Sequence, residues 1–391
     1  MTEPIALNLR AFSDDGRAWA LPEHAAAQID ASGLAAVRIG PARGTYRLAT
    51  GARVGVATGD GWEVRVRSHL DVGHLMFLLT YARNPDGWKD TLAGFTTAPD
   101  LVASVGNAMA SLTERAFRRG VLHGYRRIEE RTPVLRGRLL VGAQMARGGL
   151  PTPLDIERDD YAMDTDEHRL LLAALRLLER LPDLQPQTHL RIRRLVDSLD
   201  GVTHVLDAHR LVRPRTTRLN QHYRPALTLA DIVLHRQAPT HAVGATVSTT
   251  FAFDLHTVFE EFLEVALTRA LERHGLATTR QDGSRHLDAG NKLHLIPDLV
   301  VRRGDACASV VDAKFKHLTA QLGGDAYQML AYLLEFRASR GFLVAAEAEP
   351  ADHRIGSADK VVSVRRVDLS GRPADVLGSV AALAAEIAAT A

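Results

Sequence analysis

Apolar and polar residues alternate with a period of two in two neighbouring segments near the C-terminal end of the chain. The segments are residues 293–302 and 309–315, and the turn-forming run 303–305 lies between them. Alternation of this kind on both sides of a turn predicts two paired strands of a hairpin. Because side chains alternate between the faces of a strand, Asp312 and Lys314 are expected to point the same way.

A helical period appears on both sides of this hairpin. Residues 258–262 open an amphipathic helix that carries Glu260, and residues 325–332 predict another helix. On the second helix Gln328 and Tyr332 are four positions apart, so they share a face. An apolar run that is typical of a central strand, a further strand and an Ala-rich helix follow at 341–346, 360–369 and 373–391. This α-β-β-β-α-β order predicts a mixed sheet flanked by helices.

The remaining pattern divides the chain into three regions, and the fold class expected is α/β, of a multidomain α+β kind. Residues 1–100 form a β-rich N-terminal domain with strands at 46–48, 54–56 and 62–67 and a helix at 71–83. Residues 101–244 form a mainly helical middle region. Its predicted elements are helices at 101–119, 167–181 and 190–199, and a turn running into a strand at 133–139. Residues 245–391 form the C-terminal domain with the mixed sheet.

Composition and charge restrict the class of protein without identifying it. The chain has 391 residues, 46% of them apolar and 24% charged, which is enough for two or three domains with real cores. The net charge is +2, so any attraction to nucleic acid must come from local patches. One basic stretch, 209–218, offers candidate phosphate contacts in Arg213, Arg215 and Arg218; a solvated linker or a salt-bridged face is the alternative.

The single cysteine, Cys307, excludes a disulfide within the chain. It also argues against a structural zinc site or an iron–sulfur cluster, which need several cysteine or histidine ligands. The first residues, 1–4, lack the basic and apolar character of a leader, and no long uncharged run is suited to span a membrane. A cytoplasmic protein with no membrane contact is therefore expected.

The chemistry of the hairpin points to a phosphodiester substrate. Asp298 in the first segment and Asp312 and Lys314 in the second bring two carboxylates and one ammonium to one edge of a sheet. Such groups can hold Mg²⁺ against a phosphodiester and activate a water molecule. Each signal alone is weak, because Asp-x-Lys is common, Pro-Asp usually marks a turn, and a lone glutamate such as Glu260 is usually solvated. An acid and a lysine inside apolar strands are costly unless they are paired or bind a metal, and this favours a functional site.

The order of Glu260, Asp298, Asp312-x-Lys314 and Gln328-xxx-Tyr332 resembles the PD-(D/E)xK nuclease superfamily, in particular its branch with a Gln-xxx-Tyr helix. More narrowly, the chain resembles the McrC subunits of modification-dependent (5-methylcytosine) restriction systems. The segments that carry this resemblance beyond the nuclease region are 135–139, 164–171, 219–223 and 229–232, and more weakly 64–82. The chain departs from the family pattern at His168, where an Asn is usual, and at Arg67-Ser68, where a Pro-Lys pair is usual. Residues 1–60 match no family.

The resemblance implies an Mg²⁺-dependent DNA endonuclease, with Mn²⁺ as a substitute ion. Asp298, Asp312 and the backbone carbonyl of Ala313 would be the metal ligands, and Glu260 would bind the metal or its waters. Lys314 would orient or help to deprotonate the attacking water and stabilise charge on the phosphate.

The surrounding residues have less defined roles. Gln328 would hold the lysine, a water or the DNA backbone, whereas Tyr332 is expected to pack beneath the site. Lys316 lies on the same strand face as Lys314, where it would either contact phosphate or remain solvated.

The same resemblance implies a division of labour. The chain has no Gly-xxxx-Gly-Lys-Ser/Thr loop, so the motor would be a separate AAA+ GTPase ring on which the N-terminal and middle regions dock and whose hydrolysis they stimulate. Double-stranded DNA would be the substrate, and two nuclease subunits would pair to cut both strands. Two alternatives stay open: a nuclease that acts alone or with a helicase in DNA repair or phage defence, and a non-catalytic assembly factor that only keeps the fold.

Overall fold

The structure is a computed structural model that describes residues 5–95, 100–148, 152–181, 184–205, 210–235, 242–243, 246–247, 249–318 and 322–391. Contacts divide the chain into two compact units. Unit 1 comprises residues 1–92, 97–101 and 236–391, and unit 2 comprises 93–96 and 102–235. Helices and several sheets alternate along the chain, so the expected mixed α/β class is confirmed at that level. The three-region division stays a prediction.

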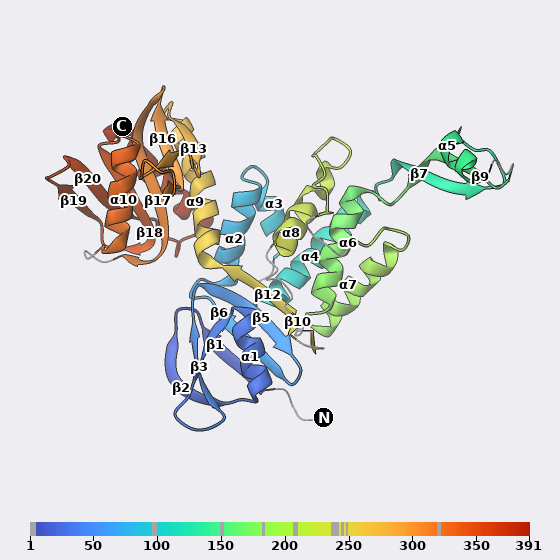
Figure 1. Cartoon of the computed structure of the whole chain (residues 1–391), viewed down its shortest axis with the longest axis horizontal. Coiled ribbons are helices and arrows are strands. Elements are labelled where there is room, and N and C mark those ends of the chain that lie inside the picture. Colours follow the sequence, from blue (N-terminus) through green and yellow to red (C-terminus); the bar gives the residue numbers. More distant parts are fainter. Residues whose placement is uncertain are drawn as a thin grey trace. The chain divides into compact units, whose positions relative to one another are not determined.

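Unit 1 begins with two small sheets (Figure 1). The first has the strand order β1-β6-β5-β12, and the second has the order β2-β4-β3 beside helix α1. Their bounds are β1 Ile5–Arg10, β2 Asp14–Ala20, α1 Glu23–Ser32, β3 Ala35–Ile39, β4 Thr45–Thr50, β5 Arg53–Gly59, β6 Trp62–Arg67 and β12 Thr249–Asp254. The three strands predicted here correspond to β4, β5 and β6.

Strand β12 joins the N-terminal sheet to the chain that leads into the C-terminal domain. It pairs antiparallel with β5, and Gly55 faces Ala252 across that pair. At Gly55 the backbone has φ +147°, and a Cβ atom would lie 2.1 Å from the carbonyl oxygen of Phe251. Only glycine allows the two strands to approach this closely. Residues far apart in sequence therefore complete one sheet.

Helix α2, Val72–Arg83, follows β6 of this sheet and packs against the helix that follows β12. The side chain of Asp71 accepts a hydrogen bond from the backbone N–H of His74 and caps the helix, as the predicted range 71–83 implies. Phe77 of α2 packs edge-on against Phe262, at 5.5 Å between ring centroids. Trp88, in the short helix α3 (Trp88–Leu92), contacts Phe77 at 5.0 Å. An aromatic cluster thus fixes α2 against the long helix α9, Leu255–Glu272.

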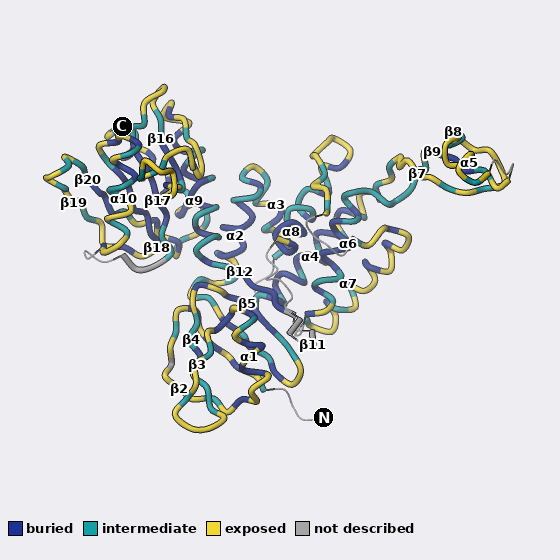
Figure 2. The backbone as a smooth tube through the Cα atoms, viewed as in Figure 1, coloured by how far each residue is buried: buried dark blue, intermediate teal, exposed yellow. Residues whose placement is uncertain are grey.

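The C-terminal part of unit 1 contains a six-stranded mixed sheet with the order β13-β16-β17-β18-β20-β19. Strands β16 and β17 form the predicted antiparallel hairpin, and β17, β18 and β20 run parallel. The bounds are β13 Ala277–Arg280, β16 Leu299–Arg303, β17 Ala306–Leu318, β18 Arg340–Ala348, β19 Ala351–Ile355 and β20 Lys360–Arg366. The expectation of a central strand at 341–346 is confirmed, because β18 is buried over most of its length (Figure 2).

The expected strand at 293–302 is interrupted in the structure. Residues His294–Leu295 form β15, which pairs with β14 (Arg285–His286) in a small separate hairpin. The chain then bends through residues 296–298 before β16 starts at Leu299. Asp298 therefore precedes the strand instead of lying within it. The apolar alternation could not show this break, because Leu295 and Leu299 are both buried on either side of it.

Two helices cover the sheet. Phe315 of β17 contacts Phe259 of α9 (Leu255–Glu272), whereas Val310 belongs to the core cluster formed with Met329 and Leu333 of α10 (Gly324–Glu335). Positions 310 and 315 point to opposite faces of the strand, so α9 and α10 lie on opposite faces of the sheet. Asp312 shares the face of Val310, and Lys314 lies on it too.

The last helix, α11 (Pro373–Thr390), packs against α9. By length and composition alone it is apolar enough to cross a membrane. Its buried side chains, among them Val380, Leu383 and Ile387, and an ion pair of 2.5 Å between Glu386 and Arg365 of β20 are features of a helix packed on a protein core. The cytoplasmic location stays a prediction.

Within its described residues, unit 2 contains the three expected helices, together with a helix at 224–235 and a ribbon that the sequence analysis did not predict. The helices are α4 Leu101–Arg118, α6 Asp166–Glu179, α7 Pro186–Ser198 and α8 Arg224–His235. Between α4 and α6 the strands β7 (Gly124–Thr132) and β9 (Leu154–Ala162) form a long antiparallel ribbon, with β8 (Arg138–Leu139) and α5 (Val141–Ala146) at its far end. The ribbon projects away from the helices of unit 2 (Figure 1). We refer to residues 124–162 as the arm.

The turn running into a strand predicted at 133–139 is confirmed as β8. The ribbon of β7 and β9 escaped prediction because its strands have no apolar face. Most residues of β7 and β9 are exposed or half-buried (Figure 2). Charged residues face one another across the ribbon, for example Arg126 and Asp160, or Arg131 and Asp155. Arg131 donates to Asp155 at 2.8 Å. Cross-strand charge pairs hold such a ribbon together without the period-two apolar pattern that identifies a half-buried strand.

Candidate functional site

The centre of the candidate site is Asp312 on β17. This side chain is 3% exposed, and its Oδ2 atom lies 2.6 Å from Nζ of Lys314 on the same strand face. Lys314 is half-buried and reaches over the strand from two positions away. Burial opposes its charge, but Asp312 and then Asp298 outweigh that effect and raise the pKa of Lys314. Strand periodicity thus produces the carboxylate–ammonium pair that the sequence suggested.

Asp298 lies next to this pair at the start of β16. Its Oδ2 atom accepts a hydrogen bond of 2.7 Å from the backbone N–H of Ala313 on the neighbouring strand. Burial and the nearby charge of Asp312 raise the pKa of Asp298 to about 7, although the hydrogen bond from Ala313 opposes the shift. Two carboxyl groups far apart in sequence therefore share one buried region and compete for a positive charge.

Glu260 approaches the same region from α9, on the opposite side of the sheet from α10. It is half-buried, and burial raises its pKa while Lys314 lowers it and Asp312 raises it. These mutual effects show that Glu260 is electrostatically close to both residues. The helix places it there because Phe259 and Phe262 on either side of Glu260 are fully buried and fix the rotation of the helix.

Helix α10 contributes Gln328 and Tyr332, which are four residues apart. Nε2 of Gln328 donates to the hydroxyl of Tyr332 at 3.0 Å, and this hydroxyl donates to the carbonyl oxygen of Ile296 at 3.2 Å. Tyr332 is 3% exposed, and burial together with the charges of Asp312 and Asp298 raises its pKa. The pair therefore supports the bend that carries Asp298. Gln328 itself is exposed.

The carboxylate oxygens gathered here have the chemistry that Mg²⁺ prefers. Crowding of Asp298, Asp312 and Glu260 disfavours their joint ionisation, and a divalent cation would relieve it. Within the described residues, however, no three His, Cys, Asp or Glu side chains are arranged around a single metal position. In this conformation the positive charge beside Asp312 comes from Lys314.

One residue near the site was missed by the sequence analysis. Glu264 lies one helical turn after Glu260 on α9, is 7% exposed, and its Oε1 atom has no hydrogen-bond partner among the described residues. Its other oxygen lies 3.7 Å from Arg280. Burial, opposed by Arg280, raises the pKa of Glu264 to about 7. The i, i+4 spacing from Glu260 is the sequence signal that would have drawn attention to it.

The candidate phosphate contacts of the basic stretch belong to unit 2, whereas the carboxylate site belongs to unit 1. Arg213 forms an ion pair of 2.9 Å with Asp231. Arg215 and Arg218 are exposed. The side chain of Lys316 lies outside the described residues.

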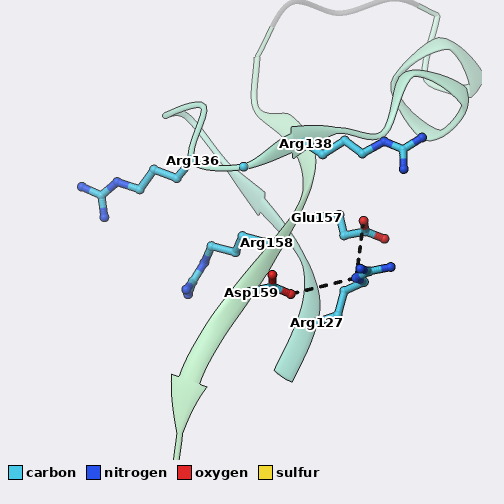
Figure 3. A pocket seen from close by; sticks show the side chains of 7 residues that line it. Arg127, Arg136, Arg138, Glu157, Arg158 and Asp159 are labelled. Atoms are coloured by element: carbon cyan, nitrogen blue, oxygen red, sulfur yellow. Dashed lines mark ion pairs between the residues drawn. The ribbon is translucent and has the colours of Figure 1, made fainter. Parts of the chain in front are cut away.

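The arm carries a separate, strongly charged cavity of about 530 Å³ (Figure 3). Its lining residues are Arg127, Arg136, Gly137, Arg138, Glu157, Arg158 and Asp159. Arg127 lies between Glu157 and Asp159, at 3.7 and 4.0 Å. At Gly137 the backbone has φ +120°, and a Cβ atom would lie 2.3 Å from the carbonyl oxygen of Glu157. The segment 135–139 therefore needs its glycine to lie against β9.

Comparison with known proteins matches residues 49–345 to the family model described as "McrBC 5-methylcytosine restriction system component". No curated protein matches the chain. Among solved structures, the chain is similar to one from the refined half-complex of the tetradecameric assembly of Thermococcus gammatolerans McrB AAA+ hexamers with bound McrC. The identity is 16%, the TM-score 0.59, and the match covers 97% of this chain and 100% of that one. A second match, from the cryo-EM structure of the Thermococcus gammatolerans McrBC complex, has 18% identity, a TM-score of 0.42 and coverage of 68% and 88%.

Proposed function

The chain belongs to the family of McrBC 5-methylcytosine restriction system components, as a McrC-type subunit, and from this premise we propose that it is the DNA endonuclease of such a system. The reaction would be Mg²⁺-dependent hydrolysis of a phosphodiester in double-stranded DNA. The C-terminal domain, residues 245–391, would be a PD-(D/E)xK nuclease domain. The β-rich region 1–100 and the helical region 101–244 would serve the assembly.

A single observation carries this proposal: Asp298, Asp312 and Lys314 meet at one end of a buried hairpin. The carboxyl groups are held by the strand pairing of β16 with β17 and by the hydrogen bond from Ala313 N–H to Asp298. A structural ion pair would need only one of the two carboxylates. Two crowded carboxylates with one ammonium fit a divalent cation and a phosphate better than they fit a packing role.

In the proposed mechanism Asp298, Asp312 and the carbonyl of Ala313 would hold Mg²⁺, with Mn²⁺ as a substitute, and Glu260 would contact the ion or its waters. The bound ion would supply Lewis-acid activation of water and phosphate. Nζ of Lys314, oriented by Asp312 at 2.6 Å, would donate to the phosphate as charge develops. Tyr332 keeps Asp298 in place through Ile296, and exposed Gln328 would contact a water or the DNA backbone.

The motor would be a separate AAA+ GTPase ring. The absence of a phosphate-binding Walker loop in the sequence supports a partner-dependent subunit. Family membership supports the same division of labour between nuclease and motor. Two copies of this chain would pair to cut both strands. Unit 2, with its projecting arm, offers a surface for docking on the ring, and exposed Arg215 and Arg218 would contact DNA phosphates.

Plasmid cleavage tests the proposal. Methylated and unmethylated plasmids would be incubated with Mg²⁺ and wild type, Asp312→Ala or the control Asp305→Asn, which alters an acid at the turn of the same hairpin. Each protein would be assayed with and without the AAA+ partner and GTP. Methylation-dependent cleavage by wild type and the control, lost in Asp312→Ala, is the expected result. Cleavage by the chain alone, blind to methylation, would remove the partner model and keep the nuclease. No cleavage under any condition would favour an assembly factor.

A further inference from the structure

Apart from Ile296 and Asp298 near its end, an excursion of the chain at the active-site end of the C-terminal sheet is not used by the chemistry described above. Strands β13 and β16 are antiparallel neighbours, with Arg280 opposite Leu299, so a short turn would suffice to connect them. Instead, residues 281–298 leave the sheet and return. The backbone N–H of Gln281 donates to the carbonyl of Asp298 at 3.0 Å, which closes the base of the excursion at a catalytic residue. We refer to residues 281–298 as the hairpin loop.

The hairpin loop is structured. His286 pairs with His294 between β14 and β15, and their rings lie 4.5 Å apart. At its tip Oδ1 of Asp288 accepts hydrogen bonds from the backbone N–H groups of Lys292 and Leu293, at 2.9 and 2.7 Å. A loop that is closed at its base and capped at its tip is preorganised for binding.

Three large aliphatic side chains of the hairpin loop are exposed to solvent. Leu287, Leu293 and Ile296 are 46%, 56% and 51% exposed. Strand alternation puts Leu287 and Leu293 on the same face as Leu295, which belongs to the core cluster of Tyr332. An exposed apolar strip thus continues outward from the core on the side of the sheet that carries Asp312. Clustered exposed aliphatic groups of this kind mark an interaction surface.

The charge of the hairpin loop fits an anionic partner. Arg285 and Lys292 are exposed and form no ion pair with any residue that the structure describes. Asp282, near the base of the loop, forms an ion pair of 3.1 Å with Arg302. Asp288 accepts backbone hydrogen bonds at the tip. The side chains of Arg285 and Lys292 can therefore bind an anionic partner, whereas Asp282 and Asp288 already have partners within the chain.

We propose that the hairpin loop is the element that holds duplex DNA beside the cleavage site. Arg285 and Lys292 bind backbone phosphates, and Leu287, Leu293 and Ile296 pack against deoxyribose in the minor groove. Cationic anchors around an apolar wedge are suited to this groove. The carbonyl of Ile296 is held by Tyr332, and Asp298 follows two residues later, so DNA seated on the loop lies next to the carboxylates. This inference rests on the proposed function and names how its substrate is positioned.

The test measures binding of the full-length chain to a labelled DNA duplex by fluorescence anisotropy in EDTA, so that no cleavage is required. For Arg285→Ala/Lys292→Ala we expect affinity to fall about tenfold at about 50 mM salt, and the slope of log K against log salt to shrink by about 1.8, which is two phosphate contacts. For Leu287→Ser/Leu293→Ser we expect weaker binding with an unchanged slope. The control Arg273→Ala/Arg354→Ala removes the same charge from exposed sites at the end of α9 and on β19.

The inference would be overturned if Arg285→Ala/Lys292→Ala had the same DNA affinity and salt slope as the control variant. It would also be overturned if the wild type did not bind DNA. A Leu287→Ser/Leu293→Ser variant that binds DNA normally but changes the sedimentation of the chain would overturn it too, since the strip would then join two copies. Because the assay is run without metal, it is independent of hydrolysis. A hairpin loop that binds DNA in a chain that never cuts it would keep this inference and reject the nuclease.

Discussion

Phe12 contacts Phe315, with 6.1 Å between ring centroids, although one belongs to the turn after β1 and the other to β17. Phe12 also meets His256 of α9 edge-on at 5.9 Å. It adopts φ +54°, which is unusual for an aromatic residue. The N-terminal sheet therefore touches both elements that carry site residues, next to Lys314 on β17 and one turn before Glu260 on α9.

Replacing Phe12 tests this contact. In Phe12→Ala we expect DNA cleavage to fall several-fold, since small displacements of catalytic groups are costly. The free energy of unfolding should fall by only about 1 kcal/mol, because the ring is 46% exposed. Phe12→Leu keeps an apolar contact and should retain most of the activity. Cleavage by Phe12→Ala at the wild-type rate, measured under single-turnover conditions, would show that the contact does not affect the site.

Tyr332→Phe removes the hydroxyl that joins Gln328 to the carbonyl of Ile296. We expect a loss of about 1 kcal/mol in unfolding free energy and a reduction in cleavage smaller than that of Asp312→Ala, because Tyr332 positions the bend before Asp298 and does not touch the reacting groups. Gln328→Ala leaves the bond from Tyr332 to Ile296 intact. Urea denaturation and cleavage rates measured on both variants separate the two roles. A Tyr332→Phe variant as inactive as Asp312→Ala would contradict a purely positioning role.

Glu264 makes stability depend on pH. Its pKa is raised from 4.5 to about 7 in the folded protein, so the folded state holds a proton that the unfolded state has released. The associated stability is fully present below pH 4.5 and is lost as the pH rises through 7. Asp298, whose pKa is also about 7, acts with the same sign. The contribution of Glu264 is therefore obtained by comparing the pH dependence of the unfolding free energy in wild type with that in a Glu264 variant.

We expect Glu264→Gln to gain about 1–3 kcal/mol of stability relative to wild type on going from pH 5 to pH 8. Chemical denaturation at the two pH values provides the measurement. Glu272→Gln, at an exposed position near the end of the same helix, serves as the control and should leave the pH dependence unchanged. An equal pH dependence in Glu264→Gln and wild type would mean that Glu264 is ionised in the folded protein at neutral pH.

Asp164 should be the critical residue at the base of the arm. It accepts hydrogen bonds from Arg126 of β7, from Arg169 of α6 at 2.7 Å and from Thr203 at 2.7 Å. Burial opposes its charge, but Arg169 and Thr203 outweigh burial and lower its pKa. Asp164→Asn keeps the shape and removes the charge, so we expect a loss of about 2 kcal/mol.

Hydrogen exchange detects the local effect of this change. In Asp164→Asn the amides of β7 near Arg126 should exchange faster, whereas those of the C-terminal sheet should not. Asp159→Asn is a matched control in the arm, because Asp159 is largely exposed and lies 4.0 Å from Arg127. Unchanged protection of β7 in Asp164→Asn would show that cross-strand pairing alone fixes the arm.

The sequence by itself determined the helices and strands whose apolar residues recur with the period of a buried face. The β16–β17 hairpin, the central strand β18 and the helices α2, α4, α6, α9, α10 and α11 follow from periods of two and of roughly 3.6 residues, since each buries one face or both. The same alternation placed Asp312 beside Lys314, and the helical spacing placed Gln328 beside Tyr332. These relations depend only on local geometry.

Tertiary structure decided every relation between distant segments. Local periodicity and a turn predict a hairpin of neighbouring strands, but they do not show which distant strands pair or which side chain bonds to which backbone group. They could not place β12 beside β5, Asp298 against the N–H of Ala313, or Phe12 against Phe315. Local periodicity also overlooked the ribbon of β7 and β9, whose strands are stabilised by opposite charges across the ribbon and bury no face. Glu264 shows the same limit, because only packing removed its carboxyl group from water and raised its pKa.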